Sequence, residues 1–137
     1  QTSLHVTTQS EGPKKWNGRN DKMNVAYNRT KNNYPVYKDI IDLVNENGSS
    51  FRMLIYHGDV DAILPVVLAV QSVNKIAADN SLFEQDYKPV WHFFDDFAGA
   101  RTGYRSITGE VSMDMLTVRG AGHSVPTVLP AQAFQMI

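Results

Sequence analysis

Two apolar runs, each followed by a glycine and then by polar side chains, constrain the fold of this sequence most strongly. The first, Met53–Tyr56, leads into His57-Gly58-Asp59-Val60-Asp61. The second, Met113–Val118, leads into Gly120-Ala121-Gly122-His123. Short apolar runs bounded by turn signals are typical of buried strands. In open α/β sheets, functional side chains gather where such strands end, so the pattern predicts an α/β sheet with a polar site at one edge.

Helical periodicity lies on both sides of the first strand. Pro35 suits a first helical turn and Gly48 suits a helix exit, which predicts an amphipathic helix of about three turns between them. The apolar residues on one face of this helix are Val36, Ile40, Ile41 and Val44. Residues 66–78 supply a second helical segment. A strand, an acidic loop and a helix in succession indicate an α/β unit.

The rest of the chain predicts further strands and a final helix. Residues 89–94 are aromatic and β-prone, 104–108 are suited to a hairpin, 113–118 alternate, and 130–137 read as the start of a helix. We interpret the aromatic cluster as core instead of a stacking platform, because no basic residues interleave with it. Its members are Trp91, Phe93, Phe94 and Phe97.

Composition excludes several classes of function. The chain has 137 residues, 42% of them hydrophobic, which suits one domain or part of one. Its 13 basic and 14 acidic residues include no dense Lys/Arg block, which argues against nucleic-acid or membrane partners. No apolar run approaches the roughly 20 residues that span a bilayer. The absence of cysteine removes disulfides and thiolate nucleophiles together.

Asp61 and His123 are the strongest candidates for catalysis. An acid and then a histidine, each after a strand, match the Ser…Asp/Glu…His order of α/β-hydrolases. We predict that Asp61 is the orienting carboxylate and His123 the general base, while Asp59 is structural and binds amides of the turn. The other histidines, His5, His57 and His92, lack metal-ligand spacing, and no glycine-rich phosphate loop is present. We therefore expect neither a metal nor another cofactor.

The nucleophile of such a triad is not evident. A catalytic serine is expected in a Gly-x-Ser-x-Gly elbow between strand and helix. Gly48-Ser49-Ser50-Phe51-Arg52 comes nearest, but it lacks the second glycine and precedes a strand. Because the serine precedes the acid in this chain order, we expect it outside these residues, and we expect the isolated chain to be inactive.

Two glycosylation sequons begin at Asn28 and Asn47.

The sequence resembles the serine carboxypeptidase family, most strongly over Leu54–Asp61 and Leu116–Pro126. The likeness covers nearly the whole chain and about the last third of a family member. It implies an α/β-hydrolase fold with a mixed, mostly parallel sheet and flanking helices. Within that fold, residues 1–33 resemble the tail of the cap region, and residues 34–137 resemble the carboxyl-terminal part of the hydrolase core, which is incomplete here.

The resemblance also implies an activity and a location. Family members remove single residues from peptide carboxyl termini, best at acidic pH, in lysosomes, vacuoles or outside cells. The catalytic acid and base carry over to Asp61 and His123, and Ser124 would form a wall near the leaving residue. The substrate would be a peptide with a free carboxyl terminus. The remaining amino-terminal part of the hydrolase, as parent or partner chain, would carry the serine.

Three other readings fit the same residues. One is a secreted binding or protective protein on this fold with catalysis lost, and another is an acyltransferase or hydroxynitrile lyase that keeps the triad. The third, outside the family, is a general esterase. Peptide, acyl-glucose and cyanohydrin substrates would distinguish among these activities.

Overall fold

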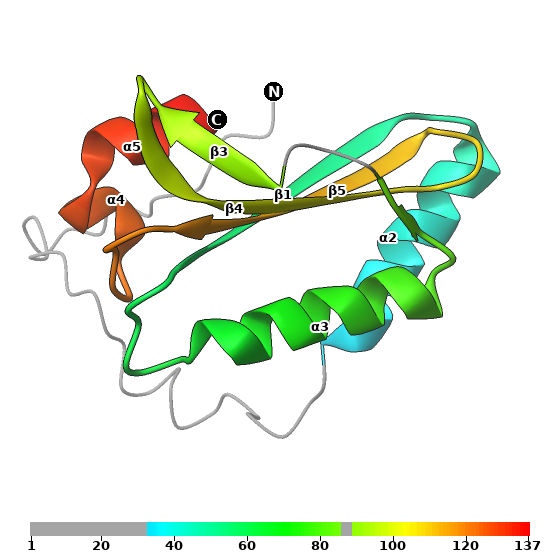
Figure 1. Cartoon of the computed structure of the whole chain (residues 1–137). Helices are drawn as coiled ribbons and strands as arrows, with labels where there is room; N and C mark the ends of the chain where they lie inside the picture. The colour runs from blue at the N-terminus through cyan, green and yellow to red at the C-terminus, as the bar shows by residue number, and fades with distance from the viewer. Residues whose placement is uncertain (1–32, 86–88) are drawn as a thin grey trace, which may run out of the picture. The chain divides into compact units, whose positions relative to one another are not determined.

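A mixed sheet organises residues 33–85 and 89–137, which are the residues that the computed structural model describes (Figure 1). Its strand order is β1-β5-β4-β2, with β3 paired to β4 outside this path. Strands β1 and β5 run parallel, and the other pairs are antiparallel. The strands are β1 (Phe51–Gly58), β2 (Phe83–Glu84), β3 (Val90–Phe93), β4 (Asp96–Arg105) and β5 (Val111–Val118).

Both long helices lie where the sequence predicts them. Helix α2 (Tyr34–Asn47) ends at Gly48, whose φ of 59° is left-handed and favours glycine. Helix α3 (Val66–Asp79) follows β1 and its acidic loop. Figure 1 shows α2 and α3 on one side of the sheet. The short helices α4 (Val125–Val128) and α5 (Pro130–Met136) gather beyond the end of β5, and α5 confirms the predicted final helix.

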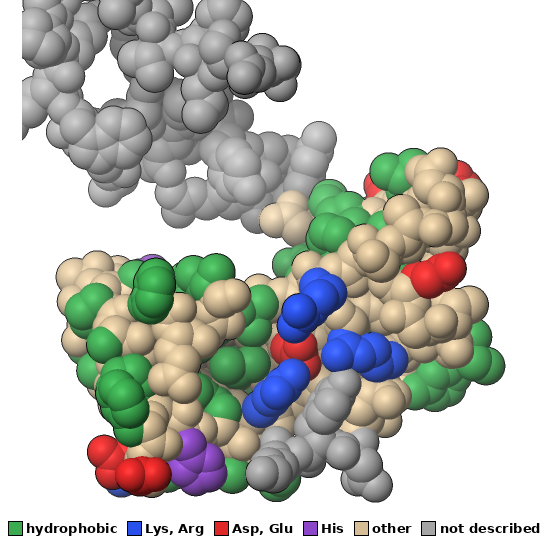
Figure 2. Space-filling model, turned by 90° about the horizontal axis from the view of Figure 1, so that it is seen from above, with side chains coloured by type: hydrophobic (Ala, Val, Ile, Leu, Met, Phe, Trp, Pro, Cys, Tyr) green, Lys and Arg blue, Asp and Glu red, His purple; other side chains and the backbone are tan. Residues whose placement is uncertain are grey.

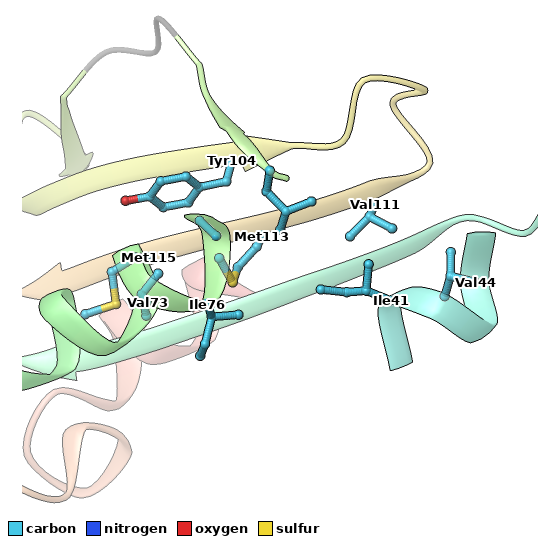
Figure 3. Close-up of a cluster of buried hydrophobic side chains, with 10 residues drawn as sticks. Ile41, Val44, Val73, Ile76, Tyr104, Val111, Met113 and Met115 are labelled. Atoms are coloured by element: carbon cyan, nitrogen blue, oxygen red, sulfur yellow. The ribbon is translucent and has the colours of Figure 1, made fainter. Parts of the chain in front are cut away.

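The main core lies between the sheet and these two long helices. Figure 3 shows Ile41 of α2 and Ile76 of α3 directed toward Met113 of β5. All three side chains are buried. Burying an aliphatic side chain of this size contributes about 1.5–3 kcal/mol relative to leaving it exposed. Of the apolar residues predicted on one face of α2, Ile41 and Val44 are buried, but Val36 is 53% exposed.

Strand β5 is buried on both of its faces, in contrast to the alternation that the sequence suggests. Residues 111–116 are all buried, including the polar side chains of Ser112 and Asp114. The physical reason is position, because β5 lies between β1 and β4 and has α2 and α3 over one face. On the other face, Arg101 of β4 forms an ion pair with Asp114 at 3.1 Å.

The aromatic cluster is not the core that the sequence suggests. Only Trp91 packs against a buried cluster, which contains Val118 and Ala121, and its indole nitrogen donates a hydrogen bond to the Thr117 carbonyl at 2.8 Å. Phe94 is 84% exposed because it lies in the tight turn that joins β3 to β4.

The predicted hairpin at 104–108 is partly confirmed, since β4 ends at Arg105 and a turn leads into β5.

The face of the sheet opposite α2 and α3 is open near its centre. Leu54 and Tyr56 of β1 are exposed there, at 37% and 40%. Figure 2 shows Lys or Arg side chains gathered around an acidic side chain on this face. A hollow of about 510 Å³ lies on it, lined among others by Arg52, Arg101 and Asp114. None of the helices within residues 33–85 and 89–137 combines the length and the hydrophobicity that a transmembrane span requires.

Candidate active site

The parallel pairing of β1 with β5 brings two distant loops to the same end of the sheet. Gly58 and Val118 are the last partners in the register. Beyond them the loops stay joined, because the Asp59 amide donates to the Val118 carbonyl at 3.1 Å and the Val60 amide donates to the Ala121 carbonyl at 3.1 Å. Residues that are far apart in sequence are therefore held side by side by backbone hydrogen bonds.

Asp59 has the structural role that the sequence predicts. Its carboxylate Oδ1 accepts a hydrogen bond from the Gly120 amide at 2.7 Å. The amide belongs to the turn after β5, so Asp59 crosslinks the two loops. Asp side chains commonly stabilise turns by accepting such backbone hydrogen bonds.

Asp61 and His123 meet at this junction. Nδ1 of His123 lies 2.9 Å from Oδ2 of Asp61. The Asp61 side chain is 2% exposed, whereas the His123 side chain is 51% exposed. A buried carboxylate thus holds one nitrogen of an accessible imidazole, which leaves Nε2 for another group. An imidazole oriented in this way is suited to general base catalysis.

Two backbone amides donate hydrogen bonds to the second oxygen of the Asp61 carboxylate. Oδ1 of Asp61 accepts hydrogen bonds from the amides of Ile63 at 2.8 Å and Leu64 at 3.1 Å. Burial by itself would raise the pKa of the Asp61 carboxyl. Hydrogen bonds from His123 and from these amides outweigh burial and lower the pKa from 3.8 to about 2. Asp61 is therefore ionised throughout the mildly acidic range.

His57, which the sequence predicts only as a weak candidate, also lies at the Asp61 carboxylate. Its Nε2 is 2.7 Å from the Leu64 carbonyl oxygen and 3.4 Å from Oδ2 of Asp61. Metal-ligand spacing, which His57 lacks, does not report on contacts with a carboxylate. The sequence signal for this contact is the position of His57 near the end of β1, four residues before Asp61. Among the described residues, no group of three or more His, Cys, Asp or Glu could hold a metal ion.

The other predicted site residues are separate from this pair. Ser124 is exposed and directly precedes α4, where its carbonyl accepts hydrogen bonds from the Thr127 and Val128 amides. Asn47 is exposed at the end of α2, and its side-chain amide donates to the Leu43 carbonyl at 2.9 Å. Asn28 and His5 lie outside the described residues.

A family model and individual relatives both show similarity of this chain to serine carboxypeptidases. The family model described as serine carboxypeptidase matches residues 1–137. Serine carboxypeptidase-like 25 of Arabidopsis thaliana is 28% identical over 137 residues, which are 99% of this chain and 25% of that protein. Serine carboxypeptidase ctsa-3.1 of Caenorhabditis elegans is 26% identical over 121 residues, which are 85% of this chain and 21% of that protein. The chain spans about a quarter of the length of the curated relatives that it matches.

The close approach of the two loops predicts that Gly58 tolerates no side chain. A Cβ atom at Gly58 would lie 2.2 Å from the Ala121 carbonyl oxygen, which is backbone and cannot move aside easily. We expect Gly58→Ala to lower the free energy of unfolding of the complete protein by roughly 1–3 kcal/mol. Gly122→Ala is the matched control, since a Cβ there meets nothing within 4 Å. Equal urea midpoints for the two variants would contradict this packing.

The lowered pKa of Asp61 predicts a pH-dependent contribution to stability. A carboxyl group whose pKa is lower in the folded state stabilises that state above its unfolded pKa, here 3.8, and loses the effect as pH falls through about 2. We expect the complete protein to be more stable than its Asp61→Asn variant above about pH 4, with a difference that shrinks toward pH 2. Urea unfolding of both proteins across this range measures the difference. A difference that is constant with pH would be inconsistent with the hydrogen bonds described.

Proposed function

Because this chain belongs to the serine carboxypeptidase family, we propose that it is the carboxyl-terminal part of an α/β-hydrolase that removes residues from peptide carboxyl termini. In this proposal, residues 1–33 belong to the cap region and 34–137 to the hydrolase core. The observation that carries it is the contact between Nδ1 of His123 and Oδ2 of Asp61 at 2.9 Å. An exposed imidazole held by a buried carboxylate is the arrangement that the base of a hydrolytic triad requires.

The proposed reaction uses His123 first as base and then as acid. Its Nδ1 proton is engaged by Asp61, so Nε2 takes the proton from a serine hydroxyl while the serine oxygen attacks the last peptide carbonyl. His123 then gives this proton to the nitrogen of the leaving residue as the peptide bond breaks. Water, activated by the same imidazole, attacks the acyl-serine ester, releases the shortened peptide and restores the serine.

The surroundings of Asp61 support work at acidic pH. With a pKa of about 2, its carboxylate remains ionised where peptide carboxyl groups begin to take up protons. Asp61 therefore continues to stabilise the imidazolium that forms at His123 during the reaction. This property agrees with the proposed location of the protein in a lysosome, a vacuole or the extracellular space.

The remaining parts of the active site are proposed to lie in the amino-terminal part of the hydrolase. The curated relatives are about four times as long as this chain, since it covers about a quarter of their length. The open face with Leu54 and Tyr56 exposed has the character of a surface that further protein covers. We propose that this part supplies the serine, the oxyanion donors and the groups that bind the substrate's terminal carboxylate.

Two surface features complete the proposal. Ser124, directly after His123, would form part of the wall beside the leaving residue. Asn47 is exposed and begins a sequon, so it would carry a glycan if the protein passes through the secretory route, as would Asn28.

Replacing the base tests the proposal. In the complete protein, His123→Ala should reduce turnover of a blocked dipeptide by roughly 10³-fold or more while the fold is retained, because no other group would accept the serine proton. The matched control is His92→Ala, whose imidazole is exposed on β3. We expect this control to retain normal turnover. Near-normal activity of the His123→Ala variant would rule out the assignment.

A further inference from the structure

Leu64 is held at both ends of its backbone by groups of the candidate site. Its amide donates to Oδ1 of Asp61 at 3.1 Å, and its carbonyl oxygen lies 2.7 Å from Nε2 of His57. His57 is part of β1, whereas Leu64 is at the far end of the loop that carries Asp61. The imidazole of His57 therefore ties this loop back to the strand from which it starts.

The partner of His57 determines which of its nitrogens carries the proton. A carbonyl oxygen accepts hydrogen bonds and cannot donate, so Nε2 of His57 must be protonated to make this contact. The same N–H lies 3.4 Å from Oδ2 of Asp61, the oxygen that faces His123. The His57 side chain is only 17% exposed, so it makes these contacts in partly buried surroundings.

We propose that His57 is a positioning residue for the catalytic pair. The Nε2–H of His57 donates to the Leu64 carbonyl and holds the backbone of Leu64 in place. The Leu64 amide in turn donates to Oδ1 of Asp61. The other oxygen, Oδ2, orients the ring of His123. This inference rests on the proposed function, because it assigns His57 a role in orienting the base. His57 touches no reacting atom, so its effect on the reaction passes through Asp61.

The chain of contacts predicts which property of His57 matters. Only an N–H at the place of Nε2 is needed, and glutamine carries its amide nitrogen at a similar distance from the backbone. Alanine has no donor there and leaves the Leu64 carbonyl unpaired beside a buried carboxylate. His57→Gln should therefore preserve the arrangement, and His57→Ala should lose it.

The test compares these two variants in the complete protein on a blocked dipeptide. Misplacing a catalytic group by a small distance is enough to reduce turnover substantially, so we expect His57→Ala to lose roughly 10- to 100-fold in kcat with little change in KM. His57→Gln should restore kcat to within about threefold of the unmodified protein. Full activity of His57→Ala would overturn the proposal, as would equal losses in the two variants with both folded.

A measurement on the unmodified protein covers the case in which His57→Ala does not fold. The nitrogen-15 chemical shifts of the two imidazole nitrogens report which one carries the proton. We expect the Nε2–H form for His57 at neutral pH, and an Nδ1–H form would overturn the proposal. This readout requires no turnover, so it separates a failure of the His57 role from a failure of the carboxypeptidase assignment. The latter would appear as an inactive protein that still contains the Nε2–H tautomer.

Discussion

The parallel hydrogen bonding between β1 and β5 is the constraint on which the candidate site depends. These strands are separated in sequence by α3 and the β3–β4 hairpin, yet their register is continuous from Phe51 and Val111 to Gly58 and Val118. Parallel strands end at the same edge of a sheet, so the loop after each strand arrives at one place. The cross-loop bonds from Asp59 and Val60 continue this pairing beyond the strands. A shift in register would separate Asp61 from His123.

The electrostatics of the site are concentrated on one carboxylate. Asp61 is almost fully buried, and an isolated carboxylate in that position would be costly. Two amides and His123 compensate by donating to its two oxygens, and they keep its pKa at about 2 despite burial. The same contacts that keep the group ionised also fix its direction. The local backbone structure of the candidate site therefore follows from the need of a buried anion for hydrogen-bond donors.

Much of this arrangement follows from the sequence, and the reasons for the exceptions are physical. Pro35 and Gly48 bound a helix by their backbone preferences, and two apolar runs predict the strands that bring Asp61 and His123 together. The spacing of His57 and Asp61 places the two residues near each other, but the contact of His57 with the Leu64 carbonyl depends on how the loop after β1 folds back, which no local pattern predicts. Burial depends on the surrounding elements, so β5 is covered on both faces and Phe94 is exposed, although their residue types suggest otherwise.

We propose that Asp61 and His123 serve a serine that lies outside these 137 residues. Labelling of the complete protein with a fluorophosphonate, followed by mass spectrometry of its peptides, tests this claim directly, because such reagents modify serines activated by a neighbouring base. We expect a single modified serine, in a Gly-x-Ser-x-Gly setting outside residues 1–137, and loss of labelling in the His123→Ala variant. Modification of a serine within this chain, or labelling that does not depend on His123, would contradict it.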